Sequence, residues 1–367
     1  MRTRVAIIGA GTAGLIAAKN LAASGIATEV YERKRRLGYP ARASGIVSIS
    51  GLGGLGIPYR KAVTNTLYGA NVHAGGEVVR VLSRKPMARV LDRERLNLLC
   101  YDESVRKGAV VVTGRDADSA LLDDLHRDSV IIGADGAVSS VARRFSMGAI
   151  GRHVLTYKAE FGVRPRDRRV VDLFFDNCVA PGFFGWMCPN SKDTLEVGVG
   201  IESSRGNSKA AFDRLMKMRE VKDAVGRGRM LSGYASIIPV RVRERIVDEK
   251  DEVVLVGDAA GQVKPTTGGG IVFGGNGAIL AARAVADHIN KGTGLSEYER
   301  EFDRRFGRDL AMHRALAGIY SRMDAGSLAF AMRAMKALGV ESFLSKYGDM
   351  DRPSVMLRRF FLRGLSD

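Results

Sequence analysis

A glycine-rich turn near the N-terminus constrains the fold of this chain more than any other feature. The apolar run ending at Ile8 reads as a buried strand, and residues 12–24 read as a helix; between them lies Gly9-Ala10-Gly11-Thr12-Ala13-Gly14. At this spacing the first glycine permits a tight turn, the second lets a pyrophosphate approach the backbone, and the third lets helix and strand pack closely. The helix N-terminus offers unpaired N–H groups and partial positive charge to phosphates. The pattern predicts a βαβ unit with a dinucleotide at its first turn.

An acidic residue at the end of the second predicted strand completes this motif. Glu32 ends the segment Ala27–Glu32, 18 residues beyond Gly14. An acid at this place accepts the hydroxyls of an adenosine ribose. We assign Glu32 and its neighbour Arg33 to the nucleotide site. A structural turn without a ligand is the alternative, and the strand–turn–helix context favours the ligand, although this motif alone does not distinguish NAD from FAD.

A second glycine-rich segment, far along the chain, distinguishes the two nucleotides. After the strand Val253–Val256 come Gly257-Asp258-Ala259-Ala260-Gly261 and then Pro265-Thr266-Thr267-Gly268-Gly269-Gly270-Ile271. A carboxylate at a strand end can accept a hydrogen bond from a ribityl hydroxyl, which FAD has and NAD lacks. The glycines let backbone lie against a flat ring, and the helix that follows directs its positive end at a reduced flavin. The segment predicts FAD; a strand–helix turn with an Asp cap is the alternative.

Composition is that of a soluble globular protein, apart from a strongly basic charge. Of 367 residues 46% are hydrophobic and 26% charged, and the formal net charge is +17. Such a charge favours anionic partners, but no nucleic-acid module is present, so we expect no nucleic acid; solubilising surface charge is the alternative. The three cysteines lack disulfide or metal spacing, which predicts a cytoplasmic setting and no metal. No apolar stretch has the length of a membrane-spanning helix.

The positions of the motifs predict a discontinuous nucleotide domain. The expected fold class is mixed α/β: a Rossmann-type FAD-binding domain interleaved with an antiparallel-sheet substrate domain, followed by a helical C-terminal region. We assign residues 1–65, 92–150 and 245–290 to the FAD-binding domain. Residues 66–91 and 151–244 form the expected substrate domain, and residues 291–367 the helical region. We expect a loop over residues 35–60 and helical structure over residues 208–226.

Three segments together resemble the flavoproteins built on the p-hydroxybenzoate hydroxylase fold. They are the first glycine motif with Glu32, the turn Ala134-Asp135-Gly136, and the second glycine segment. The resemblance covers most of residues 1–290. It implies that Asp135 and Gly136 support the cofactor from their turn, with Asp135 as an ordinary turn residue the alternative.

Within that group the chain is similar to the geranylgeranyl reductase family. Asp92-Arg93 resembles the start of a family helix whose arginine lies near the flavin ribityl and phosphate region, although a capping Asp92 explains the pair equally well. The stretch Phe184-Gly185-Trp186-Met187-Cys188-Pro189 is similar to the signature on the substrate side of the flavin. The resemblance implies that Phe184, Trp186 and Cys188 line that side; ordinary sheet core is the alternative. Members often carry a cysteine after the first βαβ unit, and residues 40–45 contain none.

This resemblance implies FAD-dependent reduction of prenyl (geranylgeranyl-type) double bonds of an isoprenoid lipid by hydride transfer from reduced flavin. Water, Tyr39, Ser44 and Cys188 remain open as proton sources. A flavin monooxygenase of a small or lipophilic substrate shares the fold and both motifs, and a flavin-binding protein without turnover is a third hypothesis. No second Rossmann motif for NAD(P)H is present. A transiently bound pyridine nucleotide and a ferredoxin-like protein both remain as electron donors.

The C-terminal segment Ser354–Leu365 has a basic amphipathic pattern. Its apolar residues Met356, Leu357, Phe360, Phe361 and Leu365 alternate with Arg358, Arg359 and Arg363. Such a helix can rest on anionic lipid headgroups, and peripheral contact with a membrane surface is one of two interpretations. Packing against its own domain is the alternative, because amphipathic helices are the norm in globular proteins.

Overall fold

A five-stranded parallel sheet contains the first predicted strands. The computed structural model describes residues 3–41, 43–250 and 252–363, with side chains up to residue 360. The strand order is β15 (Val253–Leu255), β9 (Ser129–Gly133), β1 (Arg4–Ile8), β2 (Ala27–Glu32) and β8 (Val110–Thr113). β1 runs parallel to β2 and to β9, its two neighbours. With α1 (Thr12–Ala23) between β1 and β2, the predicted βαβ unit is confirmed.

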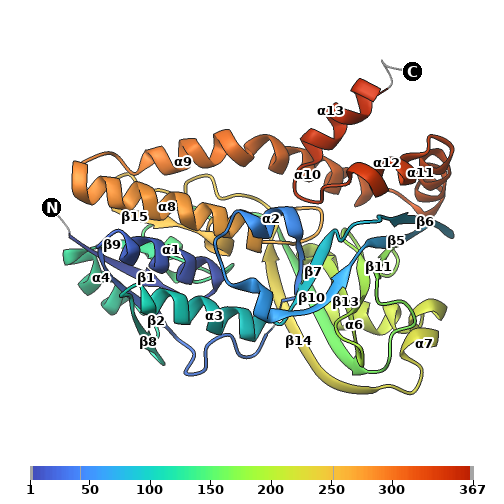
Figure 1. The fold of residues 1–367 in the computed structure, drawn as a ribbon, viewed down its shortest axis with the longest axis horizontal. Coiled ribbons are helices and arrows are strands. Elements are labelled where there is room, and N and C mark those ends of the chain that lie inside the picture. Colours follow the sequence, from blue (N-terminus) through green and yellow to red (C-terminus); the bar gives the residue numbers. More distant parts are fainter. Residues whose placement is uncertain (1–2, 42, 251, 364–367) are drawn as a thin grey trace.

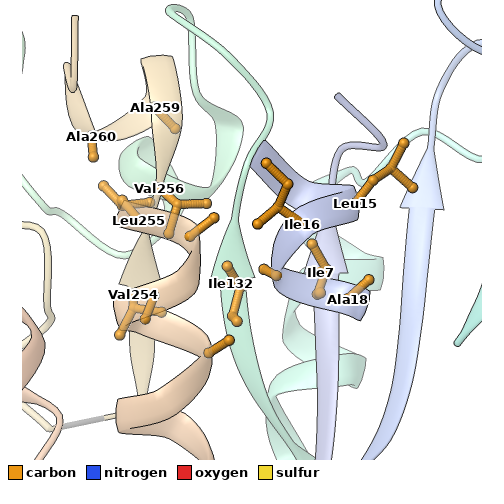
Figure 2. Close-up of a cluster of buried hydrophobic side chains, with 14 of the residues drawn as sticks. Ile7, Leu15, Ile16, Ala18, Ile132, Val254, Leu255, Val256, Ala259 and Ala260 are labelled. Carbon is orange, nitrogen blue, oxygen red and sulfur yellow. The ribbon is translucent and has the colours of Figure 1, made fainter. Parts of the chain in front are cut away.

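A helix layer covers one face of the parallel sheet and explains its apolar strands. α1 packs against α8 (Ile271–Lys291) and against α3 (Arg93–Arg106). Figure 2 shows Ile7, Ile132 and Val254 of three strands and Ile16 of α1 in one buried cluster. All four side chains are almost completely buried. Strands covered in this way read as continuous apolar runs rather than alternating ones.

A seven-stranded sheet lies beside the parallel sheet (Figure 1). Its strand order is β14 (Arg229–Pro239), β10 (His153–Gly162), β13 (Thr194–Glu202), β12 (Gly185–Pro189), β11 (Val170–Phe175), β5 (Gly69–Ala74) and β6 (Glu77–Leu82). Neighbouring strands are antiparallel except β5 and β11, which are parallel. These strands come from segments that interrupt the parallel sheet in sequence. The domain boundaries given above stay a prediction.

Alternation along β12 gives the seven-stranded sheet two different faces. Met187 packs in a cluster with Phe212 and Leu215 of α6 (Ser208–Leu215). Trp186 and Phe184 belong to a separate cluster. Because successive side chains of a strand point to opposite faces, Trp186 faces away from α6. A three-stranded sheet of β3 (Ile46–Ser48), β7 (Ala88–Leu91) and β4 (Val63–Leu67) adjoins it.

The structure confirms helix formation at residues 208–226 with a break in it, and it contradicts the expected loop at residues 35–60. Residues 208–226 form two helices, α6 and α7 (Arg219–Val225), because the backbone is extended at Met218 (φ −61°, ψ 139°). The expected loop at residues 35–60 contains β3 and the short helix α2 (Ile49–Gly53), which Ser48 caps by accepting a hydrogen bond from the Gly51 N–H. Two further helices, α4 (Ser119–Asp128) and α5 (Ser140–Arg144), were not anticipated.

The C-terminal region is helical, as predicted. It contains α9 (Ser296–Phe302), a π-helical turn, α10 (Arg308–Tyr320), α11 (Ala325–Ala337), α12 (Val340–Tyr347) and α13 (Pro353–Arg363). α11 and α12 pack on β6, at the edge of the seven-stranded sheet, as Figure 1 shows. No helix in the described part of the chain is long and apolar enough to cross a bilayer.

α13 presents part of its apolar face to the protein. The Phe360 ring lies edge-on against Phe343 of α12, with centroids 5.1 Å apart. The sulfur of Met356 accepts a hydrogen bond from the Asp349 N–H. Leu357 is exposed. The side chains of Phe361 and Arg363, and Leu365 as a whole, lie outside the described residues. Membrane contact by this helix stays a prediction.

Candidate functional site

A cavity of about 610 Å³ is lined from both the parallel and the seven-stranded sheet. The sequence motifs, which are far apart in the chain, meet there. The predicted residues on its wall are Gly11, Thr12, Ala13, Arg93, Gly136, Gly257, Asp258, Gly268, Gly269, Gly270, Ile271, Phe184 and Trp186. The predicted residues Gly9, Gly14, Glu32, Arg33, Asp135, Pro265 and Cys188 are not part of this wall.

The three glycines of the first motif have different structural roles. Gly9 has φ +106°, and a Cβ there would lie 2.4 Å from the Ala134 carbonyl oxygen. A Cβ on Gly14 would lie 2.0 Å from the Gly9 oxygen. These two glycines therefore allow β1, α1 and the Ala134 turn to pack closely. Gly11 has an ordinary φ, and a Cβ on it would meet no atom within 4 Å, so it leaves open space at the cavity wall.

The start of α1 is held by a residue that the sequence analysis missed. Asn97 of α3 is buried; its Nδ2 donates to the Ala10 carbonyl at 2.7 Å and its Oδ1 accepts from the Thr12 hydroxyl at 3.0 Å. Neither α1 nor α8 has a side-chain cap at its N-terminus. Two helix N-termini thus reach one cavity with unpaired N–H groups, an arrangement that suits phosphate or another anionic group.

Arg93 and Asp258 both line this part of the cavity, and their charges interact. The Arg93 Nη1 is buried and has no hydrogen-bond partner among the described residues, and its Nη2 lies 3.4 Å from the Thr12 hydroxyl. Burial raises the pKa of Asp258, and the charge of Arg93 opposes that rise. A buried donor without a partner is costly. The cavity therefore fits a ligand with acceptor oxygens beside Arg93, as the ribityl and phosphate groups of FAD would supply.

Glu32 and Asp135 bind backbone groups near the cavity instead of lining it. Glu32 accepts hydrogen bonds from the N–H groups of Ala10, at 2.8 Å, and Lys34, at 2.9 Å. Asp135 accepts from the Ser140 N–H at 2.6 Å and the Ser139 hydroxyl at 2.7 Å, so it stabilises the start of α5. A carboxylate keeps free lone pairs after two such bonds, so Glu32 can still accept hydrogen bonds from ribose hydroxyls. Ribose binding by Glu32 stays a prediction.

The second glycine segment is supported by two buried side chains that sequence patterns did not reveal. The Gly257 N–H donates to Gln262 Oε1 at 2.8 Å, and Gln262 Nε2 donates to the Tyr298 hydroxyl at 2.6 Å. Tyr298 in turn donates to the Leu255 carbonyl at 2.8 Å. A Cβ on Gly270 would lie 2.9 Å from Asp258 Oδ1. This packing holds Asp258 beside the N-terminus of α8.

A buried carboxylate, Glu196, supports three residues of the cavity wall: Trp186, Ser44 and Lys158. Glu196 Oε1 accepts from Trp186 Nε1 at 2.8 Å and from the Ser44 hydroxyl, while Oε2 accepts from Lys158 Nζ at 2.7 Å. Burial alone would raise the pKa of Glu196, but the Lys158 charge and these hydrogen bonds hold it below its usual range. Glu196 therefore stays ionised and fixes the Trp186 ring, Lys158 and Ser44 in place.

The side chains considered as proton sources differ in their access to the cavity. Ser44 lines it. Tyr39 is 45% exposed and is not on the wall. Cys188 is fully buried, and burial raises the pKa of its thiol. Cys188 lies in the same cluster as Trp186 but is covered completely and is not on the cavity wall, so its role on the substrate side stays a prediction.

We predict that His313 of α10 makes the folded protein less stable in acid. Its Nδ1 lies 2.8 Å from the Thr266 hydroxyl, and burial together with the charge of Lys264 lowers its pKa to about 4. Between pH 6.5 and 4 the unfolded chain binds a proton here that the folded protein does not. Stability should therefore fall by about 2 kcal/mol from pH 8 to pH 5 because of this group. Urea unfolding of wild type and His313→Gln at both pH values tests this; an equal loss in the variant would contradict it.

Comparison with known proteins agrees with this geometry. Residues 2–310 match the family described as FAD binding domain. The digeranylgeranylglycerophospholipid reductase of Methanothrix thermoacetophila is 29% identical over 92% of each chain. Digeranylgeranylglycerophospholipid reductase 1 of Methanothermobacter thermautotrophicus is 30% identical over 84% of each chain. The crystal structure of a geranylgeranyl bacteriochlorophyll reductase-like protein from Thermoplasma acidophilum has a TM-score of 0.81 and 19% identity, with 97% of this chain and 94% of that chain covered.

These matches decide between the cofactors and the families considered from the sequence. The family match includes both glycine motifs, so the cofactor is FAD. The curated relatives share most of their length with this chain, including the region that carries Phe184 and Trp186. The fold seen in the solved structure extends over nearly all of it. The chain belongs to the geranylgeranyl reductase family of FAD-dependent oxidoreductases.

Proposed function

We propose that this enzyme saturates prenyl double bonds of an isoprenoid lipid by hydride transfer from reduced FAD. The observation that carries the proposal is the chemistry of the cavity wall. Besides the glycine motifs, its wall includes the apolar side chains of Trp186, Leu173, Leu67, Met87 and Met356. A mainly apolar wall suits a hydrocarbon chain, and unbranched methionines adapt to a flexible one. The relatives named digeranylgeranylglycerophospholipid reductases support the same substrate class.

The residues of this chain would bind and orient the two reactants. The N-termini of α1 and α8, with Arg93 and Asp258, would hold the cofactor through its polar groups. Reduced FAD supplies a hydride from its N5. Trp186 and Phe184 would hold the double bond at a fixed distance from the flavin and exclude water from that face. Saturation then requires one hydride on one alkene carbon and one proton on the other. Ser44 and Lys158, which both bind Glu196, are among the residues of the wall that carry exchangeable protons.

A flavin monooxygenase is the second candidate, and the polar edge of the cavity favours it. Lys158, Thr156 and Ser236 line the cavity on neighbouring strands, and the Thr156 and Ser236 hydroxyls are 2.7 Å apart. A substrate that carries oxygen could bind there by hydrogen bonds. The two candidates differ in what reoxidises the flavin: an alkene in the reductase, molecular oxygen in the monooxygenase.

An anaerobic reoxidation experiment tests the proposal. The purified FAD-loaded protein is reduced chemically without oxygen and mixed with a geranylgeranyl lipid, while the absorbance of oxidised flavin is followed. We expect the lipid to reoxidise the flavin, with one double bond lost per flavin by mass spectrometry. The fully saturated lipid, which offers no double bond, is the matched control. If the flavin stays reduced until air is admitted and a hydroxylated product then forms, the reductase proposal is wrong and the monooxygenase takes its place.

A further inference from the structure

A buried ion pair joins the second glycine segment to the C-terminal region. Lys264 begins the flavin loop, defined here as residues 264–270, and its Nζ lies 2.6 Å from Asp351 Oδ1. Asp351 lies between α12 and α13, 87 residues further along the chain. The two side chains are only 6% and 7% exposed. Neither residue belongs to a motif recognised in the sequence, and the pair has no role in the function proposed above.

Asp351 also binds a third segment of the chain. Its Oδ2 accepts a hydrogen bond from the Ser48 hydroxyl at the start of α2. A Cβ on Gly51 would lie 2.7 Å from Asp351 Oδ2 and 2.4 Å from Val272 of α8, so the three segments are tightly packed. Lys264 and Ser48 both line the cavity. One carboxylate thus connects two parts of the cavity wall.

The C-terminal helices hold the flavin loop at a second point. The Thr266 hydroxyl and His313 Nδ1 are 2.8 Å apart, and the Tyr320 hydroxyl donates to the Thr266 carbonyl at 3.0 Å. Inside the loop, the Gly268 N–H donates to the Lys264 carbonyl at 2.9 Å. A loop with three consecutive glycines has many accessible conformations. Contacts from outside the loop are therefore needed to keep one of them.

We propose that Asp351 is a positioning residue for the cofactor: it holds Lys264, fixes the flavin loop in its FAD-binding shape and neutralises the ammonium beside Gly269. Lys264 lies directly against that glycine, since a Cβ on Gly269 would be 2.9 Å from Lys264 Cε and 3.4 Å from Nζ. Breaking a buried pair leaves an uncompensated charge. An ammonium without its partner near the flavin would also favour the extra negative charge of the reduced cofactor.

Asp351→Asn tests the proposal, because it keeps the side-chain size and removes the charge. FAD binding to the FAD-free protein is measured by fluorescence titration, and the midpoint potential of the bound flavin by dye equilibration. We expect the FAD dissociation constant to rise about 10-fold or more and the potential to become more positive. Lys264→Met combined with Asp351→Asn removes both charges and should return the potential to the wild-type value. A potential reports on charge near the flavin, which a purely structural role would leave unchanged.

Glu77→Gln is the matched control. It breaks the contact between Lys336 of α11 and Glu77 of β6, at 2.8 Å, which also joins the C-terminal region to a sheet but lies outside the cavity wall. Wild-type affinity and potential in Asp351→Asn, or equal changes in Glu77→Gln, would overturn the proposal. Should Asp351→Asn not fold, Tyr320→Phe removes one hydrogen bond to the loop and should weaken FAD binding about 5-fold; unchanged affinity there would equally overturn it. This proposal depends on FAD binding and not on the prenyl substrate. The positioning role of Asp351 and the proposed prenyl reductase activity can therefore each fail without the other.

Discussion

Replacing Gly11 by valine should weaken FAD binding at least about 100-fold and leave the protein folded. The backbone of Gly11, with φ −72° and ψ 173°, is extended and suits valine. A Cβ there would meet no atom within 4 Å, so the substitution costs little in the FAD-free protein. The valine side chain would instead occupy the space in front of the first turn of α1. A pyrophosphate must enter that space to reach the N–H groups of the helix.

Titration of the FAD-free variant with FAD, together with thermal unfolding by circular dichroism, measures both parts of this prediction. Gly151→Val is the matched control: a Cβ there also meets nothing within 4 Å, and Gly151 is not on the cavity wall. Gly14→Val should behave differently, since its Cβ would lie 2.0 Å from the Gly9 oxygen and the fold itself should suffer. Wild-type FAD affinity in Gly11→Val would show that the cofactor does not bind at this turn.

Exchanging Trp186 for alanine should slow the oxidation of reduced flavin by a prenyl lipid about 100-fold, without weakening FAD binding. The indole is held on two sides. Its Nε1 donates to Glu196 at 2.8 Å, and its ring packs so closely on β13 that a Cβ on Gly198 would lie 2.2 Å from it. Such a rigid wall can keep an alkene near the flavin. Without the indole the prenyl chain of the substrate has room to move, and a displacement of about 1 Å can cost roughly 100-fold in rate.

Anaerobic stopped-flow mixing of the reduced enzyme with lipid gives this rate directly. Met187→Ala is the matched control, because Met187 is the next residue on β12 but packs toward α6. It should lower stability and leave the rate close to wild type. Trp186→Phe keeps an aromatic wall but loses the hydrogen bond to Glu196. Its rate should therefore lie between those of Trp186→Ala and Met187→Ala. If Trp186→Ala and Met187→Ala react equally fast, the indole does not line the path of the substrate.

Local patterns predicted the parts of the site that local geometry decides. The glycine spacing after β1 works because turn, helix start and phosphate approach all lie within a few residues. The same holds for the segment around Asp258, which follows a buried strand and precedes α8. Helix formation at residues 208–226 was predicted as well, but the break at Met218 was not, since nothing in its sequence requires an extended backbone.

The supporting residues could not be predicted, because their partners are distant in sequence. Asn97 donates a hydrogen bond to the Ala10 carbonyl, 87 residues away. Glu196 accepts hydrogen bonds from Ser44, 152 residues away, and from Trp186 and Lys158 on neighbouring strands. A buried carboxylate has no sequence signature of its own; its partners become visible only when the strands are paired. Cys188 is different: it lies in the same cluster as Trp186, as its position in the motif predicts, but neighbouring side chains bury it completely.

The sequence by itself determined the βαβ unit, the choice of FAD and the family, because these depend on glycines and an acid at fixed short spacings. Only the tertiary structure decided which of those residues reach the cavity, that one Arg93 donor has no partner among the residues it describes, and that Asp351 binds Lys264. The physical reason is that backbone conformation is set mainly by near neighbours, whereas burial, charge pairing and cavity shape depend on segments brought together by folding.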